Sequence, residues 1–264
     1  MRLIPVLIVG ALVMGARPAV AQQPIADSTR GLEKRDGYFP LYWDAAKGRL
    51  LLEIPSGRLG RDFLYLPSIA TGLGDANLGI DRGTIGREQI ARFERVGPQV
   101  LLVLQNPQFR AVGDSAALAR SVHESFPLST LAAFDLLSEE GGRLLVDATT
   151  FALSDLSDVL GTLRGGDQGA FQLDARRSTV FLPRTRAFPR NTEIETSLTF
   201  TTDQPGSSIQ AHAPEPRAIT VRQHLSLVQL PDAGFRPRRF DPRIGLFPVT
   251  YYDFAQPLDR TARS

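Results

Sequence analysis

Short stretches of apolar and alternating residues dominate the chain from residue 37 onward and predict β-strands. They are rich in β-branched and aromatic residues, and turn-forming Gly, Pro, Asn and Asp residues separate them. The predicted strands cover 38–43, 49–54, 63–70, 88–96, 100–105, 143–147, 178–182, 192–202 and 218–230. The clearest hairpin joins 88–96 to 100–105 through Gly97-Pro98.

Helical periodicity is confined to the middle of the chain. It predicts a helix over 115–126, with Asp114 as a possible N-cap, and a short helix over 155–163 capped by Ser154. The apolar run 128–137 fits either a helix or a strand, because a short apolar run does not distinguish them. We therefore predict a mainly β, β-rich α+β fold. Its antiparallel meander would form a sandwich or partial barrel, with two or three short inserted helices.

Polar and proline-rich segments divide the chain into parts. Residues 22–36 are polar and predict a flexible leader before a β-rich domain over 37–230. Residues 231–264 contain five prolines and predict an extended connector with little regular structure. The glycine-rich stretch 71–86 has no lysine, so it lacks the G-x-x-x-x-G-K-[ST] pattern of a phosphate loop. We interpret this stretch as a long mobile connection.

The first 21 residues are typical of a secretory signal peptide. Arg2 precedes an uncharged apolar run over 3–15, and Ala19 and Ala21 form the A-x-A pattern read by signal peptidase. The alternative is a membrane anchor, which needs about 20 apolar residues. This run is shorter and Pro18 follows it. The sequence predicts a periplasmic or extracellular protein, cleaved after Ala21, with no membrane span after cleavage.

Loss of the signal peptide changes the charge balance. The full sequence has 30 Lys and Arg against 28 Asp and Glu, and removal of Arg2 and Arg17 leaves 28 of each. A neutral chain does not favour nucleic acid or an anionic membrane as a partner, because such partners select a basic surface. Cysteine is absent, which excludes disulfides, thiolate metal sites and cysteine nucleophiles.

The three histidines form no recognisable metal site. His123-Glu124 begins an H-E-x-x-H motif, but Pro127 stands where the second histidine belongs. His212 lies in a Ser- and Pro-rich loop and His224 in a predicted strand, without metal-ligand spacing. There is no G-x-S-x-G nucleophile elbow either. The sequence therefore predicts no catalytic, metal-binding or cofactor-binding residue in this chain.

Carboxylate pairs and two arginine-rich stretches are the remaining candidates. The pairs Glu139-Glu140 and Asp155/Asp158 are available for acid–base chemistry, but solvated helix ends explain them better. The arginine-rich stretches cover 176–190 and 235–243, and Asp241 can clamp a neighbouring guanidinium bidentately. We interpret them as structural ion pairs that pin the connector onto the β-domain. Binding of an anionic ligand is the alternative.

Three stretches of the sequence resemble one known family. They are 37–54 (GYFPLYWDAAKGRLLLEI), 186–195 (RAFPRNTEIE) and 226–245 (SLVQLPDAGFRPRRFDPRIG). Together they resemble the N-terminal, non-catalytic region of large exported bacterial zinc-dependent metalloproteases of metzincin type. That region is classified as domains of unknown function. The resemblance covers about 37–259.

The resemblance implies an accessory domain that packs against or orients a protease domain in the same chain. In that family the protease domain follows this region and carries H-E-x-x-H and a third histidine. Neither has a counterpart here, so the resemblance transfers no catalytic residue, and zinc is expected only in the absent catalytic domain. The chain would then be a fragment, a truncated gene product or a free-standing homologue of the accessory region.

The rival hypothesis is a self-contained periplasmic or secreted binding protein for a peptide or glycan. It predicts a concave pocket lined by aromatics such as Tyr38, Tyr42 and Trp43. The accessory hypothesis predicts instead an exposed apolar patch where the missing domain docks. An enzyme that uses an unrecognised carboxylate site has no positive feature in the sequence to support it.

Export of the full chain from a bacterial host should yield a mature protein that begins at Gln22. Because signal peptidase needs a small residue before the cut, Ala21→Leu should block processing, whereas Ala11→Leu inside the apolar run should not. Intact-mass spectrometry of the exported protein measures both. An exported wild-type chain that keeps its first residues would contradict the prediction.

Overall fold

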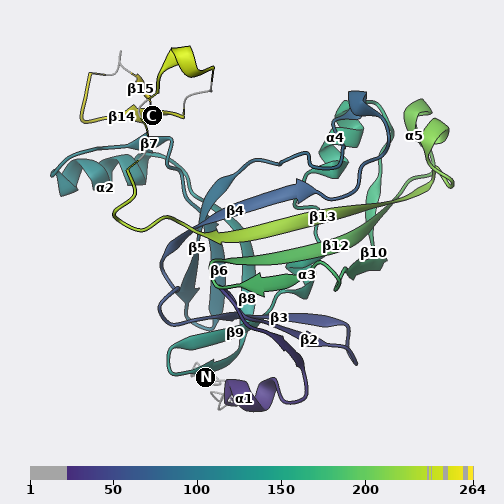
Figure 1. Cartoon of the computed structure of the whole chain (residues 1–264), viewed down its shortest axis with the longest axis horizontal. Coiled ribbons are helices and arrows are strands. Elements are labelled where there is room, and N and C mark those ends of the chain that lie inside the picture. The colour runs from purple at the N-terminus through teal and green to yellow at the C-terminus, as the bar shows by residue number, and fades with distance from the viewer. Residues whose placement is uncertain (1–22, 237, 239, 246–248, 258–260, 264) are drawn as a thin grey trace, which may run out of the picture.

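The computed structural model describes residues 23–236, 238, 240–245, 249–257 and 261–263; the predicted signal peptide lies outside the described residues. Within them, strands predominate and the helices are short (Figure 1). The strands are β1 (Glu33–Arg35), β2 (Leu41–Asp44), β3 (Arg49–Ile54), β4 (Asp62–Ile69), β5 (Gln89–Val96), β6 (Gln99–Leu104), β7 (Phe109–Arg110), β8 (Ser129–Glu140), β9 (Arg143–Asp147), β10 (Gln172–Val180), β11 (Arg186–Phe188), β12 (Asn191–Thr201), β13 (Ala218–Gln229), β14 (Thr250–Asp253) and β15 (Thr261–Arg263). The helices are α1 (Ile25–Ser28), α2 (Ala116–Ser125), α3 (Thr149–Ala152), α4 (Val159–Gly165), α5 (Ser207–His212) and the 3-10 helices η1 (Ala76–Leu78) and η2 (Pro242–Ile244).

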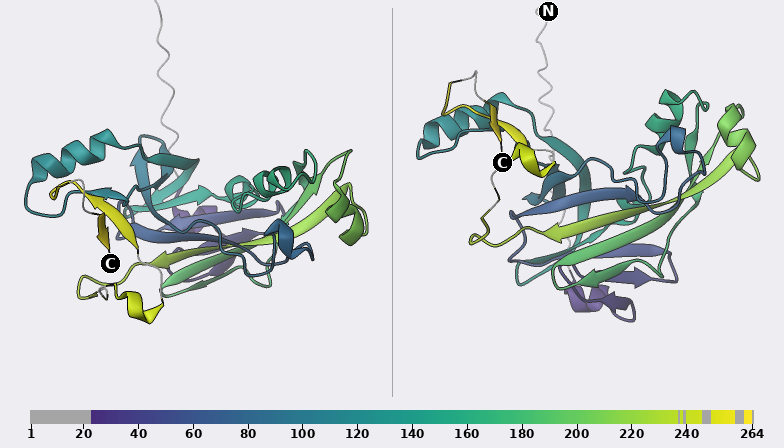
Figure 2. Two further views of the ribbon diagram at one scale, coloured as in Figure 1. Left: turned by 90° about the horizontal axis from the view of Figure 1, so that it is seen from above. Right: turned by 45° about the horizontal axis from the view of Figure 1, so that its top comes forward.

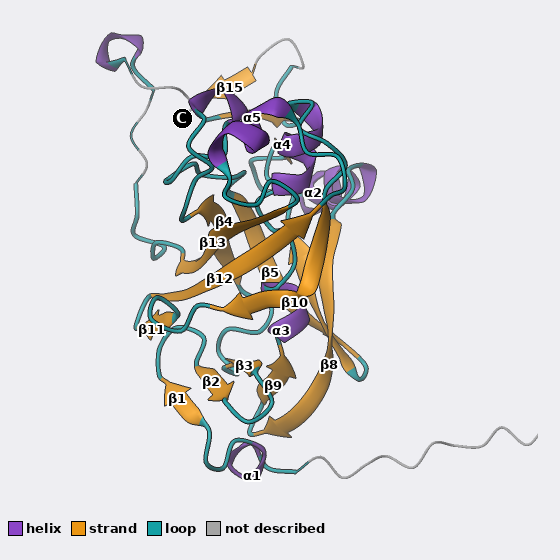
Figure 3. Cartoon of the chain, turned by 90° about the vertical axis from the view of Figure 1, so that its right-hand side faces the viewer, coloured by secondary structure: helices purple, strands orange, loops and turns teal. Residues whose placement is uncertain are grey.

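Twelve of the strands form one antiparallel sheet that curls into a half-barrel (Figure 3). The strand order is β1-β2-β3-β9-β8-β6-β5-β4-β13-β12-β10, and β11 pairs with β12. Strand β8 joins the two halves because it pairs with β6 along its first part and with β9 along its second. Register shifts in both pairings bend the sheet there. The predicted mainly β fold with a partial barrel is confirmed.

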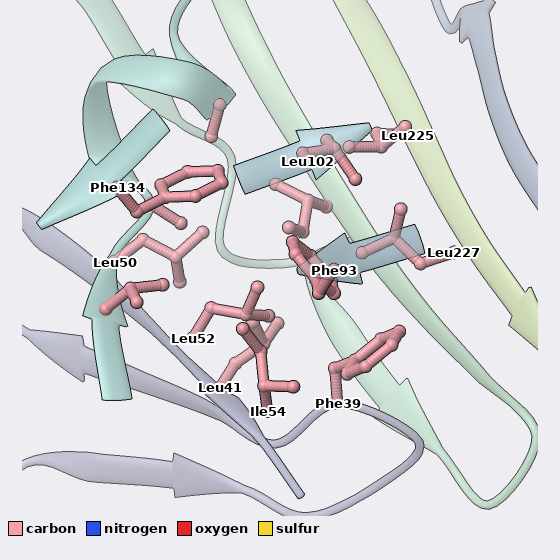
Figure 4. Packing of buried hydrophobic residues seen from close by; sticks show 14 of the residues in the cluster. Phe39, Leu41, Leu50, Leu52, Ile54, Phe93, Leu102, Phe134, Leu225 and Leu227 are labelled. Carbon is pink, nitrogen blue, oxygen red and sulfur yellow. The ribbon is translucent and has the colours of Figure 1, made fainter. Parts of the chain in front are cut away.

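Aromatic side chains fill the inner face of the half-barrel. Phe39, Phe63 and Phe93 are at most 1% exposed, and their ring centroids lie 5.2 Å apart in each pair. Figure 4 shows that Phe39 and Phe93 meet leucines from both halves of the sheet, such as Leu52 on β3 and Leu227 on β13. Truncating a buried phenylalanine of this kind costs about 3–5 kcal/mol. This cluster therefore supplies a large share of the stability of the fold.

Helices α4 and α5 cover the inner face at its other end (Figure 2), whereas α3 packs against the aromatic core through Ala152. The buried polar side chain of Gln223 on β13 binds the segment between α3 and α4 to the sheet. It is 2% exposed, donates hydrogen bonds to the carbonyls of Ala152 and Ser154, and accepts one from the amide of Leu156. A buried amide with these bonds avoids the cost of an unsatisfied polar group. The chain after α3 is thereby fixed against β13.

The segment before β2 closes the gap between the two ends of the sheet. The amide of Tyr38 donates to the carbonyl of Phe188 on β11 at 2.7 Å. The hydroxyl of Thr192 on β12 accepts from the amide of Phe39 and donates to its carbonyl, both at 2.9 Å. Only glycine fits at position 37, because a Cβ there would lie 2.5 Å from the Cβ of Ala187.

The predicted flexible leader over 22–36 is wrong for the residues described. It contains α1 and β1, and β1 pairs with β2. Ile25 is 2% exposed and packs with Tyr42 and Leu51. One buried apolar residue fixes this segment, which is too little to produce a periodic pattern in the sequence.

The predicted mobile connection over 71–86 is also wrong. Ile80 in its centre is 1% exposed, and its carbonyl accepts from the amide of Leu73 at 3.0 Å. Further on, the carbonyl of Thr84 accepts from the amide of Ile69 at 2.9 Å, so the loop folds back along β4. The glycines of this stretch allow the tight returns that bury its few apolar side chains.

The helix boundaries differ from the prediction in small ways. Ser115 rather than Asp114 is the N-cap of α2, since its hydroxyl accepts from the amide of Leu118. Helix α4 begins at Val159, later than predicted, and the carboxylate of Asp155 accepts its first amides. The ambiguous run 128–137 lies almost wholly in strand β8, because it can pair with both β6 and β9.

The proline-rich segment 231–264 has more regular structure than predicted. Its described residues include η2, β14 and β15, and β14 pairs in parallel with β7. Phe109 on β7 stacks on Phe126 with ring centroids 3.8 Å apart, and on Tyr252 of β14 at 5.6 Å. These stacked rings attach the small sheet to the end of α2, and Figure 1 shows the two elements side by side. The pairing joins segments far apart in sequence, so no local pattern reveals it.

Gly37→Ala should lower the free energy of unfolding by about 1–3 kcal/mol, because the added methyl overlaps the backbone and side chain of β11. Gly57→Ala is the matched control, since a Cβ there meets no heavy atom within 4 Å. It should change the free energy by about 0.5 kcal/mol or less. Urea denaturation measures both, and equal effects of the two substitutions would contradict the closure at Gly37.

Candidate functional site

A cavity of about 840 Å³ opens on the outer face of the half-barrel. Successive side chains of a strand point to opposite faces, so Ile194 and Leu225 enter the core while their neighbours face this cavity. Its floor is formed by β4, β12 and β13, and its walls by the loop 70–86 and the turn before β11. The same alternation that builds the core thus presents polar side chains on the opposite face.

A histidine between two glutamates occupies the floor of the cavity. Nε2 of His224 lies 2.6 Å from Oε2 of Glu193, and its Nδ1 lies 3.3 Å from Oε2 of Glu195. Strand pairing sets this arrangement, because Glu195 is directly opposite His224 in the β12–β13 register. Both ring nitrogens therefore face carboxylates, an arrangement that favours the imidazolium form.

Further groups complete the hydrogen bonding of the two glutamates. Glu193 accepts from the hydroxyl of Ser226 at 2.5 Å and from the side-chain amide of Asn191. Oε1 of Glu195 lies 3.1 Å from Nη1 of Arg222. The guanidinium of Arg222 also lies over the ring of Phe181, 4.3 Å from its centroid. Each carboxylate on the floor thus has a cationic partner within the site.

The pKa values in the cluster shift in the directions expected for an ion pair. The hydrogen bond to Glu193 raises the pKa of His224 above its usual value and outweighs the opposing effect of burial. Burial works to raise the pKa of Glu193, but the hydrogen bonds from His224, Ser226 and Asn191 hold it below its usual value. The folded state therefore favours the charged forms of both side chains.

Three arginines stand around the rim of the cavity. Arg82 belongs to the loop 70–86, and Arg184 and Arg186 to the chain around the start of β11. All three are exposed. None of them forms an ion pair with a carboxylate of the described residues. The exposed ring of Phe188 adds an apolar surface on the same side.

The floor has the residue types of a catalytic triad but not the geometry. Ser68 lies opposite His224 in the β4–β13 register. Its hydroxyl, however, donates to the backbone carbonyl of His224 at 3.4 Å. The imidazole nitrogens are both engaged with carboxylates, so neither is available to take a proton from Ser68. In the part of the chain that the structure describes, no three His, Asp or Glu side chains are grouped as a metal site.

The structure keeps the three histidines apart. His123 is exposed on α2, and His212 lies on α5 with its Nδ1 2.8 Å from the carbonyl of Ser208. Helices α2 and α5 lie at opposite ends of the molecule (Figure 1). Only His224 belongs to the cavity. A shared site for the three is excluded by this separation.

The carboxylate pairs that the sequence offered as acid–base candidates have structural roles instead. Glu139 pairs with Arg95 at 2.6 Å, and Glu140 pairs with Arg143 at 2.8 Å. Asp155 caps α4 through its carboxylate. These groups are engaged in local hydrogen bonds, and none of them lines the cavity.

The predicted aromatic ligand pocket is wrong. Tyr38 is 3% exposed and Tyr42 is 5% exposed, so neither ring can contact a ligand. Trp43 is partly buried and packs against the core. These side chains serve the packing of β2 against the rest of the half-barrel.

The two arginine-rich stretches have different roles. Asp241 clamps Arg243 bidentately, with contacts of 2.9 Å and 2.6 Å, as the sequence predicted. That pair is local to 235–243 and does not attach the segment to the β-domain. Attachment comes instead from the pairing of β14 with β7 and from Asp253, which accepts from the amide of Val112 at 2.9 Å. In the stretch 176–190, two arginines face the cavity rather than a carboxylate.

The sequence pattern does not reveal the Glu193–His224–Glu195 cluster. Residues two apart in a strand lie on one face, so the sequence already places Glu193 and Glu195 on the same face of β12. The register that sets His224 between them depends on the pairing of β12 with β13. That pairing is a property of the assembled sheet.

No helix among the described residues is long and apolar enough to cross a membrane. Comparison with known proteins gives one result. The sequence model of a family described as Domain of unknown function (DUF5117) matches residues 83–264, which is more than half of the chain. The matched part includes the Glu193–His224–Glu195 cluster, Arg184 and Arg186. No curated protein and no solved structure matches the chain.

His224→Gln should lower the free energy of unfolding by about 1–3 kcal/mol near pH 6 and by much less near pH 9. The raised pKa of His224 gives a stabilisation that is complete below its unfolded value of 6.5 and is lost as pH rises through the folded value. The lowered pKa of Glu193 gives a second stabilisation, which is present above the unfolded pKa of 4.5 and is lost as pH falls through the folded value. Urea denaturation at the two pH values measures the difference.

The matched control for this prediction is His123→Gln on the exposed face of α2. It removes no contact to a carboxylate of the described residues and should change the free energy by about 0.5 kcal/mol or less at both pH values. A destabilisation by His224→Gln that is as large near pH 9 as near pH 6 would show that the ion pair is not its cause.

Proposed function

The chain belongs to the family of the domain of unknown function DUF5117, and we propose that it is a non-catalytic accessory region of an exported zinc-dependent metallopeptidase. In this proposal it packs against or orients a catalytic domain of the same polypeptide. The zinc ion and the catalytic residues belong to that domain. The predicted signal peptide over 1–21 directs the protein to the periplasm or beyond.

The observation that carries the proposal is that the three stretches resembling the peptidase family meet in the structure. Tyr38 and Phe39, from the first stretch, bond to Phe188 and Thr192 of the second. Ser226, from the third, donates to Glu193 of the second at 2.5 Å. The first stretch lies more than a hundred residues before the second in the sequence, yet the first and the third both contact the second in the fold. The resemblance therefore falls on one contiguous part of the fold, and this supports the proposal.

The small C-terminal sheet supports an orienting role. Its strand β14 is attached to β7 by backbone pairing, and the ring of Tyr251 lies under the guanidinium of Arg110, 4.0 Å away. Tyr252 and Phe254 donate backbone hydrogen bonds to Gln108 and Arg110, both at 2.8 Å. A domain joined after this sheet would start from a fixed position on the surface. A flexible connector could not impose an orientation in that way.

Exposed apolar side chains gather at the same end of the molecule. A hollow of about 430 Å³ lies beside α2 and is lined by the exposed Leu128 and the partly exposed Phe109 among others. Val112 and Tyr252 nearby are 55% and 41% exposed. Exposed apolar surface is expected where another domain docks, so this patch supports the proposal. The accessory hypothesis expected such a patch, and this end is where we place the contact with the catalytic domain.

The reading frame beyond codon 264 tests the proposal. We expect it to continue into a segment with H-E-x-x-H and a third histidine. The longer protein should hydrolyse a casein substrate in a zinc-dependent manner, whereas residues 22–264 alone should not. Leu128→Asp in the longer protein should reduce the thermal stability of the catalytic domain, because it places a charge in the apolar contact.

Val96→Asp is the matched control for the contact. Val96 is 56% exposed at the β5–β6 turn, away from the hollow beside α2. It should leave the catalytic domain unchanged. A stop codon directly after codon 264, or hydrolysis by residues 22–264 alone, would contradict the accessory role. Equal effects of the two substitutions would contradict the contact at α2.

A further inference from the structure

The floor of the outer-face cavity is balanced in charge. Glu193 pairs with His224, and Glu195 pairs with Arg222. With His224 protonated, two carboxylates therefore face two cations. The negative charge on the floor is satisfied within the site and does not draw the rim arginines inward. What a ligand meets at the mouth of the cavity is the positive charge of the rim.

The rim arginines are suited to carboxylate recognition. A guanidinium binds a carboxylate bidentately through two parallel N–H donors. Arg82, Arg184 and Arg186 have no carboxylate partner among the described residues, so this capacity is unused within the chain. Pairing in a hollow between protein walls is stronger than on an open surface, because less water screens the charges.

The spacing of the arginines matches an extended chain better than a single ion. The loop that carries Arg82 runs along β4, and Arg186 is on β11, with β4, β13 and β12 between the loop and β11. Strands lie about 4.8 Å apart, so the two rims are separated by about 19 Å at the backbone. The arginine side chains line the cavity from both rims and shorten this gap, so glutamates four residues apart on an extended peptide, about 13 Å, can pair with both. One phosphate or carboxylate group cannot reach both rims.

Size and shape also favour a peptide. A volume of about 840 Å³ lies near the upper end of the range of about 300–1,000 Å³ that is common for ligand pockets, so there is room for several residues of an extended peptide. The cavity is recessed between the loop 70–86 and the turn before β11, so a flat bilayer surface cannot reach its floor. Phe188 offers an apolar contact for the aliphatic part of a glutamate side chain.

We propose that this cavity binds an acidic segment of another polypeptide, with carboxylates of the segment paired to Arg82 on one rim and to Arg184 and Arg186 on the other. This site goes beyond the accessory role, because it does not require an attached peptidase domain. The ligand is recognised by spaced negative charge rather than by a particular sequence.

Fluorescence anisotropy of a labelled hexaglutamate peptide, titrated with residues 22–264 at low ionic strength, tests the proposal. We expect saturable binding, and at least tenfold weaker binding by the double variant Arg184→Ala/Arg186→Ala. Arg82→Ala should weaken binding several-fold from the opposite rim. Circular dichroism should show that these exposed substitutions leave the fold intact.

Two controls make the result specific. Arg176→Ala removes an exposed arginine of the same stretch that does not line the cavity, and it should change the affinity less than twofold. Hexaglutamine should not bind. The proposal is overturned if binding is not saturable, or if Arg176→Ala weakens binding as much as the double variant does. It is also overturned if inorganic phosphate displaces the peptide when the two supply the same concentration of negative charge. None of these outcomes depends on an attached catalytic domain, so this proposal and the accessory role can fail separately.

Discussion

The hydrogen bonds between Phe39 and Thr192 hold the two ends of the half-barrel together. One buried hydroxyl satisfies both the amide and the carbonyl of Phe39, so this backbone enters the core without unpaired polar groups. The ring of Phe39 then reaches Phe63 and Phe93 at the centre of the core. Without this closure, the aromatic cluster would be open on one side.

The closure also determines the outer face. Strand β12 carries Thr192 and Ile194 toward the core and Glu193 and Glu195 toward the cavity. Its position next to β11 and β13 therefore fixes the packing of the core and the geometry of the polar cluster together. The two faces of the half-barrel differ in chemistry because successive side chains along each strand point to opposite faces. Here the inner face provides stability and the outer face provides charged groups available to a ligand.

Local patterns were enough to predict most of the strands. Strands β3 and β9 have the predicted bounds, and the β5–β6 hairpin turns at Gly97, whose φ is 58°. The failures have a common cause. Partners far away in sequence fix the positions of Ile25, Ile80 and the rings of β14. A pattern among neighbouring residues cannot reveal such distant contacts. The segments 22–36 and 71–86 have few apolar residues and were therefore predicted to be flexible. In the structure, tertiary contacts order them.

By itself, the sequence determined the class of the fold, the alternation of its strands and the absence of cysteine chemistry. These features depend on residue types and their spacing, which are local. The tertiary structure alone decided that Glu193, Glu195 and His224 form one cluster, and that arginines from the loop 70–86 and from the chain around the start of β11 line one cavity. The reason is that strand register and loop packing are set by the whole sheet, where the gain from burying one face selects the pairing.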